Sequence, residues 1–461
     1  MKRFVPCFVF GILCLVLCLT VRNASADVFR NGQKICFYGD SITHGGRFHY
    51  MIYDYYLTRF PNAKISFLNA GVAGDTASGA MTRIEEDVFS QDPDVVVLMF
   101  GMNDVGRGNY VSAPSEDQLR RQEGSLKWYA ESTAKLAGML QEKLDPHFIF
   151  LTPSPFDQTG VNDRNNNQPG CNDGLGRCAE IVKALAAELA SKKAPGTVEV
   201  VDLHAPMTAF NAEKQKKDPR YTIIGPDRVH PGAPGHLMMA WLFLKSQNAP
   251  ALVSRVVLEG ETVLSAENAV VRDLQKTDGG LACTVLAKAL PFPIDPGAYS
   301  VLEDLPIVQD LNREIFCVKG LSSGNHELLI DGEVVGTYTA EELQEGVDLA
   351  MNDKTPQFRQ AQQVRVLGLV RRDTEVILRN YAAVRWYLRR WVDPDDLSAV
   401  KKIFDEKMAK STGYFETKVP GYLANWENRG EVLRKLADQT EELEKMRIPS
   451  AHRYEVRPCA P

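Results

Sequence analysis

ICFYGDSITHGG (residues 35–46) joins a short apolar run to a glycine-rich polar turn. The apolar run predicts a buried β-strand that ends at Gly39. The polar residues that follow lie beyond the carboxyl end of this strand, which is where ligands bind in open parallel sheets. Taken alone, Ser41 fits a helix-capping serine as well as a serine whose hydroxyl is exposed for chemistry.

Apolar runs and helical stretches alternate from this junction to about residue 250. Further strands are expected at ISFLNAG (65–71), VVVLMFG (95–101), HFIFLTPSPF (147–156) and VEVVDLH (198–204). Helical spacing of apolar residues is found over 51–60, 80–89, 116–144, 178–193 and 235–246. Strands that alternate with helices predict a parallel sheet with helices on both faces.

Three more polar motifs accompany these elements. NAGVAGD (69–75) and GMND (101–104) each follow a predicted strand, and DRVH (227–230) precedes the last helix. A serine hydroxyl is a weak nucleophile that needs an adjacent base, and an Asp–His pair supplies one. A glycine N–H and an Asn side chain can donate to a developing oxyanion. Each motif alone fits an ordinary turn, whereas their order along the chain favours one common site.

The motifs GDSI, NAGVAGD, GMND and DRVH, in this order, resemble the four blocks of the SGNH/GDSL hydrolase family. The resemblance covers roughly residues 34–244, with Ile42 where the family name has Leu. It implies a flavodoxin-like α/β/α sandwich and a catalytic triad of Ser41, Asp227 and His230. It also implies an oxyanion hole built from Ser41, Gly74 and Asn103, with Asp40 supporting the nucleophile turn. The family needs no metal and no organic cofactor.

Residues 1–26 are predicted to be a signal peptide. Lys2 and Arg3 precede an apolar stretch, and Ala24-Ser25-Ala26 provides small residues for cleavage. We expect a secreted or periplasmic protein, although an uncleaved membrane anchor is the alternative. No later segment is long and apolar enough to span a membrane, so no stable span is expected after cleavage. The catalytic domain is then assigned to 27–250.

Two further regions are expected after residue 250. Short alternating apolar runs predict a β-rich accessory domain over 251–350, with a hairpin at Asp331-Gly332. Residues 351–461 are polar and periodic, which predicts a helical C-terminal region. Its helix over 357–391 is rich in arginine and tryptophan and could meet an acidic glycan or a membrane surface. We favour the simpler interpretation, in which its aromatics pack and its charges are solvated.

Six of the nine cysteines follow the predicted signal peptide. An exported chain can form disulfides, and CNDGLGRC (171–178) suggests a small closed loop, but the pairing is left open. No CxxC pair is present and no His lies near Cys171 or Cys178, which disfavours a zinc site.

The composition argues against nucleic acid as a partner and leaves several functions open. A formal net charge of −6 gives no support for nucleic-acid binding. The leading hypothesis is a secreted ester hydrolase that removes acyl groups, most plausibly acetyl, from carbohydrate. A lipase or lysophospholipase-like esterase, acyl transfer to a sugar hydroxyl, and a non-catalytic glycan-binding protein with a vestigial site are the alternatives.

Overall fold

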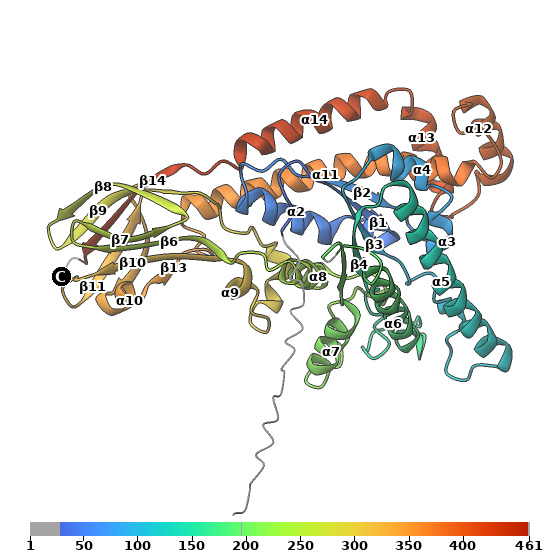
Figure 1. Cartoon of the computed structure of the whole chain (residues 1–461), viewed down its shortest axis with the longest axis horizontal. Coiled ribbons are helices and arrows are strands. Elements are labelled where there is room, and N and C mark those ends of the chain that lie inside the picture. Colours follow the sequence, from blue (N-terminus) through green and yellow to red (C-terminus); the bar gives the residue numbers. More distant parts are fainter. Residues whose placement is uncertain (1–27, 195, 460–461) are drawn as a thin grey trace, which may run out of the picture.

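The computed structural model describes residues 28–194 and 196–459. The predicted signal peptide lies outside the described residues. Figure 1 shows a parallel sheet with its helices at one end of the molecule and a β-rich region at the other. Two long helices, α11 (Pro356–Leu388) and α14 (Arg429–Met446), run along one side between them.

The first sheet has five parallel strands in the order β2-β1-β3-β4-β5, the flavodoxin-like order expected from the resemblance. Its strands are β1 (Lys34–Gly39), β2 (Ser66–Gly71), β3 (Val95–Met99), β4 (His147–Leu151) and β5 (Val198–Val201). Gly39 is in register with both Gly71 and Met99, so three strands end level with one another. This shared edge brings the polar motifs that follow the strands close together.

Helices cover both faces of this sheet, as the alternating pattern predicts. Along β1, Ile35 and Phe37 pack into one apolar core while Cys36 and Tyr38 pack into another. The first core is closed by α2 (Arg47–Arg59), α8 (Ala233–Ser246) and α11. The second is closed mainly by α5 (Glu116–Lys143) and α6 (Cys171–Ala190). The predicted α/β/α sandwich is therefore confirmed.

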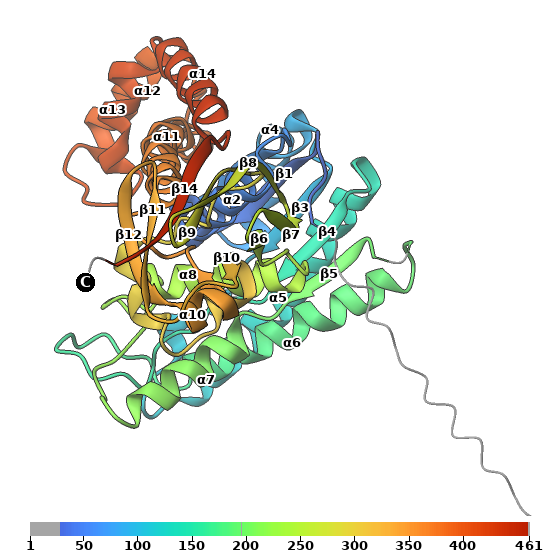
Figure 2. The ribbon, with the colours of Figure 1, turned by 90° about the vertical axis from the view of Figure 1, so that its left-hand side faces the viewer.

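The β-rich region consists of two sheets that face one another across a shared apolar core (Figure 2). The first sheet contains β6 (Leu252–Glu259), β7 (Thr262–Glu267), β10 (Arg313–Lys319) and β13 (Val347–Asp348). The second contains β8 (Ala269–Thr277), β9 (Gly280–Ala287), β11 (Asn325–Ile330), β12 (Glu333–Thr339) and β14 (Ala451–Pro458). Asp331 and Gly332 connect β11 to β12 with φ values of 51° and 83°, as the hairpin prediction requires.

The C-terminal region is helical, but its last segment departs from the prediction. Strand β14 returns to the β-rich region and pairs with β11 on one side and β9 on the other. It therefore occupies an interior position in the sheet, with Tyr454 and Val456 buried in the core. The remaining elements are α12 (Leu397–Ile403), a π-helical turn (Phe404–Met408), α13 (Val419–Asn425) and α14.

Three local expectations in the first domain need correction. Residues 80–89 are split between α3 (Ala77–Ala80), α4 (Ile84–Asp87) and a 3-10 turn, and α7 (His204–Gln215) was not predicted. Helix α6 begins at Cys171, so the expected closed loop is wrong: Cys171 and Cys178 are buried free thiols on one helix. Gly174 and Gly176 allow this helix to approach Tyr110 and His204, where a Cβ would collide or crowd.

In the described part of the chain, no helix has the length and apolar character needed to cross a bilayer.

Candidate active site

Ser41 is the first residue of the short helix α1 (Ser41–His44), directly after β1. Asp40 caps this helix, because its carboxylate accepts a hydrogen bond from the backbone N–H of Ile42 at 3.0 Å. Gly39 cannot be replaced without strain, since a Cβ there would lie 2.7 Å from the carbonyl oxygen of Met99 and would also collide with Thr43. The tight strand-to-helix turn thus fixes the position of the Ser41 hydroxyl.

His230 connects Ser41 to Asp227 through both ring nitrogens. Its Nε2 lies 2.8 Å from Ser41 Oγ, and its Nδ1 lies 2.5 Å from Asp227 Oδ2. With the proton on Nδ1, the ring donates to Asp227 and accepts from the serine hydroxyl, which is the arrangement of a serine nucleophile with its base. Residues separated by 189 positions in the sequence meet here.

The Asp227 turn is held by its own hydrogen bonds. Asp227 Oδ1 accepts from the backbone N–H groups of Val229 and His230, at 3.1 and 3.0 Å. Partial burial alone would raise the pKa of Asp227, but the hydrogen bonds from His230 and Val229 outweigh it and lower the pKa. The carboxylate therefore stays ionised and can orient the imidazole.

Gly74 and Asn103 line the same cavity as Ser41 and His230. Gly74 has a φ of 76°, a left-handed conformation that favours glycine. One N–H of the Asn103 amide donates to the carbonyl oxygen of Asp75 at 2.8 Å, which leaves the second N–H available. The cavity has a volume of about 550 Å³. The structure thus brings together all the residues that the sequence singled out for the triad and the oxyanion hole.

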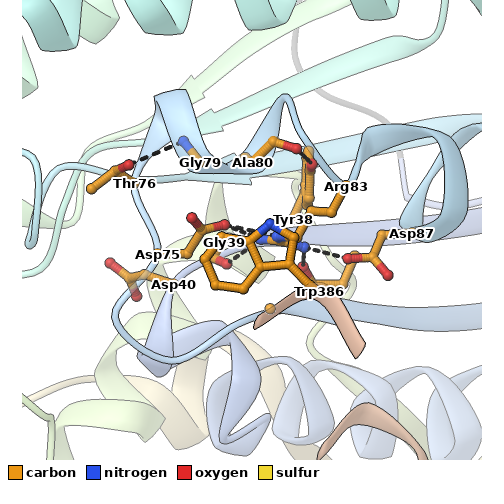
Figure 3. A network of polar contacts seen from close by, with 12 residues as sticks. Tyr38, Gly39, Asp40, Asp75, Thr76, Gly79, Ala80, Arg83, Asp87 and Trp386 are labelled. Atoms are coloured by element: carbon orange, nitrogen blue, oxygen red, sulfur yellow. Dashed lines mark hydrogen bonds and ion pairs between the residues drawn. The ribbon is translucent and has the colours of Figure 1, made fainter. Parts of the chain in front are cut away.

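A buried ion network joins Arg83 to Asp75, the residue after Gly74, and to Asp87 (Figure 3). Arg83 donates to Asp75 at 2.7 Å and to Asp87 at 2.6 Å. It also donates to the carbonyl oxygens of Ala70 and Gly39, at 2.7 and 3.1 Å. One side chain therefore fixes the ends of β1 and β2, the positions from which Ser41 and Gly74 are presented.

Two buried groups near Ser41 have shifted pKa values. Asp40 is 2% exposed, and burial raises the pKa of its carboxyl group to about 7. Burial lowers the pKa of His44 to about 3, so its imidazole is neutral. The Nδ1 atom of His44 accepts a hydrogen bond from the backbone N–H of Ala73 at 3.1 Å, while its ring lines the cavity. His44 thus both lines the cavity and supports the backbone at Ala73.

Arg47 and the polar segment 162–172 do not line the cavity around Ser41. Arg47 lines a separate, smaller cavity next to α11. The polar segment 162–172 contacts the turn that carries Asp227: Asn166 donates to the carbonyl oxygen of Pro226 and accepts from Arg228. This segment therefore supports the position of Asp227.

The C-terminal region provides one wall of the cavity, which the sequence did not predict. The residues concerned lie on α11 and on the segment before α13: Val376, Asn380, Tyr414, Phe415 and Lys418. Helix α11 is attached to the catalytic domain by Arg379, which donates to the carbonyl oxygen of Gly71 and pairs with Asp87. The indole N–H of Trp386 adds a hydrogen bond to the Thr82 hydroxyl oxygen at 2.7 Å. Arg379 is thus buried and paired, contrary to our expectation of solvated charges.

Within residues 28–194 and 196–459, no group of three or more His, Cys, Asp or Glu side chains could hold a metal ion.

Comparisons with known proteins agree with this geometry. Residues 37–238 match the GDSL-like Lipase/Acylhydrolase family. An acetylxylan esterase from Geobacillus stearothermophilus is 29% identical over 230 residues, which cover 47% of this chain and 94% of that enzyme. The uncharacterized lipoprotein YqeF of Bacillus subtilis (strain 168) is 32% identical over 21% of this chain and 40% of its own length.

A solved structure is similar over nearly the whole chain. The gut microbial diltiazem-metabolizing enzyme BT4096 superposes with a TM-score of 0.86 and 28% sequence identity, covering 94% of this chain and 99% of its own. The match of residues 37–238 covers the catalytic domain, which is similar to the GDSL-like lipase/acylhydrolase family. The chain is an esterase of this type, a hydrolase that acts on carboxylic ester bonds.

Proposed function

We propose that the protein removes acetyl groups from carbohydrate esters, with Ser41 as nucleophile, His230 as base and Asp227 as the orienting acid. The observation that carries this proposal is the pair of hydrogen bonds of His230, which accepts from the Ser41 hydroxyl at Nε2 and donates to Asp227 from Nδ1. A serine, a base in contact with it and a carboxylate that fixes the base are the parts that acyl transfer requires.

The chemical steps follow from these contacts. His230 takes the Ser41 proton while Oγ attacks the ester carbonyl carbon, and the carbonyl oxygen becomes an oxyanion. The backbone N–H groups of Ser41 and Gly74 and the free N–H of Asn103 stabilise this charge. His230 then protonates the leaving alcohol, which departs and leaves an acyl-serine. Water, deprotonated by His230, attacks the acyl-serine, and Ser41 recovers its proton as the carboxylic acid leaves.

Similarity to the acetylxylan esterase supports an acetylated carbohydrate as substrate. The diltiazem-metabolizing enzyme, which resembles this chain in the C-terminal regions as well, supports small drug molecules as further substrates. Export is part of the proposal: the predicted signal peptide over residues 1–26 would bring the enzyme to extracellular or periplasmic glycans.

The test is hydrolysis of 4-nitrophenyl esters of increasing chain length, together with acetate release from partially acetylated xylo-oligosaccharides. We expect a preference for acetyl and loss of activity in Ser41→Ala. Ser90→Ala is the matched control, because Ser90 is exposed and does not line the cavity. A folded wild-type protein that prefers long acyl chains, or that releases no acetate from the oligosaccharides, would contradict the proposal.

A further inference from the structure

The cavity around Ser41 has two walls of different origin. The catalytic domain provides Ser41, His230 and the oxyanion donors, whereas α11 and the 414–418 segment provide the opposite wall. We call the second wall, formed by Val376, Asn380, Tyr414, Phe415 and Lys418, the C-terminal wall. It lies outside the family match of residues 37–238. Its side chains therefore have no assigned role in the chemistry described above.

The C-terminal wall is held in place by polar contacts with the catalytic domain and by aromatic packing of its loop segment on α11. Arg379 donates to the Gly71 carbonyl oxygen at 2.7 Å and to Asp87 at 2.8 and 2.6 Å. Phe415 stacks on Tyr387 of α11 with ring centroids 4.8 Å apart and also contacts Trp386. The segment that carries Lys418 is thereby fixed relative to Ser41.

The charges that line the cavity are positive. Arg107 and Lys418 are its lining cations, and no carboxylate lines it. Among the described residues, no Asp or Glu oxygen lies within 4.0 Å of either cation. Arg107 donates to the carbonyl oxygen of Met102, which holds it on the catalytic side. Desolvation lowers the pKa of Lys418, as expected for a partly buried lysine without an anionic partner.

Lys418 shares its wall with an aromatic ring and an amide acceptor. Its Nζ is 4.6 Å from the centroid of the Tyr414 ring, and Tyr414 remains 44% exposed. On the same wall, the side chain of Asn380 hydrogen-bonds to the ring of His44, and its buried Oδ1 keeps a second lone pair for another donor. An aromatic face, a cation and an amide acceptor together match a sugar ring that carries a carboxylate and hydroxyl groups.

We propose that the C-terminal wall is a subsite for a carboxylate-bearing sugar ring. In this subsite Lys418 binds the carboxylate, Tyr414 packs against the ring and Asn380 accepts from a hydroxyl. The preferred substrate is then an acetylated acidic glycan rather than a neutral one. This inference rests on the proposed function, since it specifies the carbohydrate whose ester Ser41 attacks.

The first test is a matched series of aryl acetates that differ in charge: 4-acetoxybenzoate, 4-acetoxybenzamide and 4-acetoxy-N,N,N-trimethylanilinium. We expect Lys418→Met to lower kcat/KM for the anion about tenfold, mainly through KM, because a nearby positive charge is lost. The same variant should raise kcat/KM for the cation. A folding defect would instead lower the values for all three esters. Lys410→Met is the control, because Lys410 is exposed and lies outside the cavity.

The second test measures binding without turnover. Ser41→Ala, as the full chain, is titrated calorimetrically with unacetylated tri-galacturonate and with its neutral methyl ester. We expect binding of the acid only, weakened by added salt and abolished when Lys418→Met is combined with Ser41→Ala. Equal binding of both sugars, no binding of the acid, or equal effects of Lys418→Met on the three acetates would overturn the subsite. Acid binding without any ester hydrolysis would instead refute the proposed function alone.

Discussion

Substitution of Asn103 is expected to lower the rate of catalysis much more than it lowers the stability of the fold. One of its N–H groups holds the carbonyl oxygen of Asp75 at 2.8 Å, and the other is available to the cavity. Asn103→Ala therefore removes one structural hydrogen bond and one oxyanion donor. The structural bond contributes about 1 kcal/mol to stability. The donor contributes about 2.7–4 kcal/mol to the transition state, which corresponds to a loss of about 10²–10³ in kcat.

The assay compares kcat on 4-nitrophenyl acetate with the free energy of unfolding in urea for the same preparations. Asn109→Ala is the matched control, because the Asn109 side chain also donates to a backbone carbonyl, that of Gly106, and does not line the cavity. We expect the control to keep its kcat. A kcat of Asn103→Ala within a few-fold of wild type, or an equal fall in the control, would refute the oxyanion role.

Three further predictions concern stability. Arg83→Met leaves the buried carboxylate of Asp75 without a cation, while Asp87 keeps Arg379, so the free energy of unfolding in urea should fall by about 3–5 kcal/mol; a change below about 1 kcal/mol would contradict the network. Because burial raises the pKa of Asp40 to about 7, the folded state binds this proton more tightly than the unfolded state. Relative to Asp40→Asn, the free energy of unfolding of the wild type should fall by up to about 4 kcal/mol between about pH 4 and about pH 7. Parallel plots of unfolding free energy against pH for the two proteins would argue against the raised pKa of Asp40. Deletion of β14 (Ala451–Pro458) removes an interior strand, so limited proteolysis should digest the β-rich region first, and unchanged resistance would argue against its pairing.

Much of the catalytic half could be predicted from sequence because its signals are local. β3 is a continuous run of apolar residues that is buried throughout, and Gly39 and Gly71 end their strands at the same level. Since the motifs follow these strands, their order along the chain was enough to bring them to one edge. The Asp227–His230 pair needs only one turn of chain, so its contact was also predictable.

The C-terminal contributions were missed because they depend on partners far away in the sequence. β14 is a strand because β9 and β11 leave a position open between them, more than 100 residues earlier in the chain. In the sequence, Arg379 resembles a surface arginine of an amphipathic helix, because its partners Asp87 and Gly71 lie far away along the chain. Lys418 shows no sequence signal at all. Helix α6 was shortened in the prediction because Gly174 and Gly176 disfavour a helix unless close packing requires them.

The most direct test of the account is to identify the residue that reacts. The mature protein is treated with a fluorophosphonate esterase inhibitor, and peptide mass spectrometry locates the label while ester hydrolysis is followed. The account predicts one label per chain, on Ser41, with activity lost in proportion to labelling and no label in His230→Ala, because the hydroxyl then lacks its base. Full activity after complete labelling of Ser41, or inactivation with the label on another residue, would contradict it.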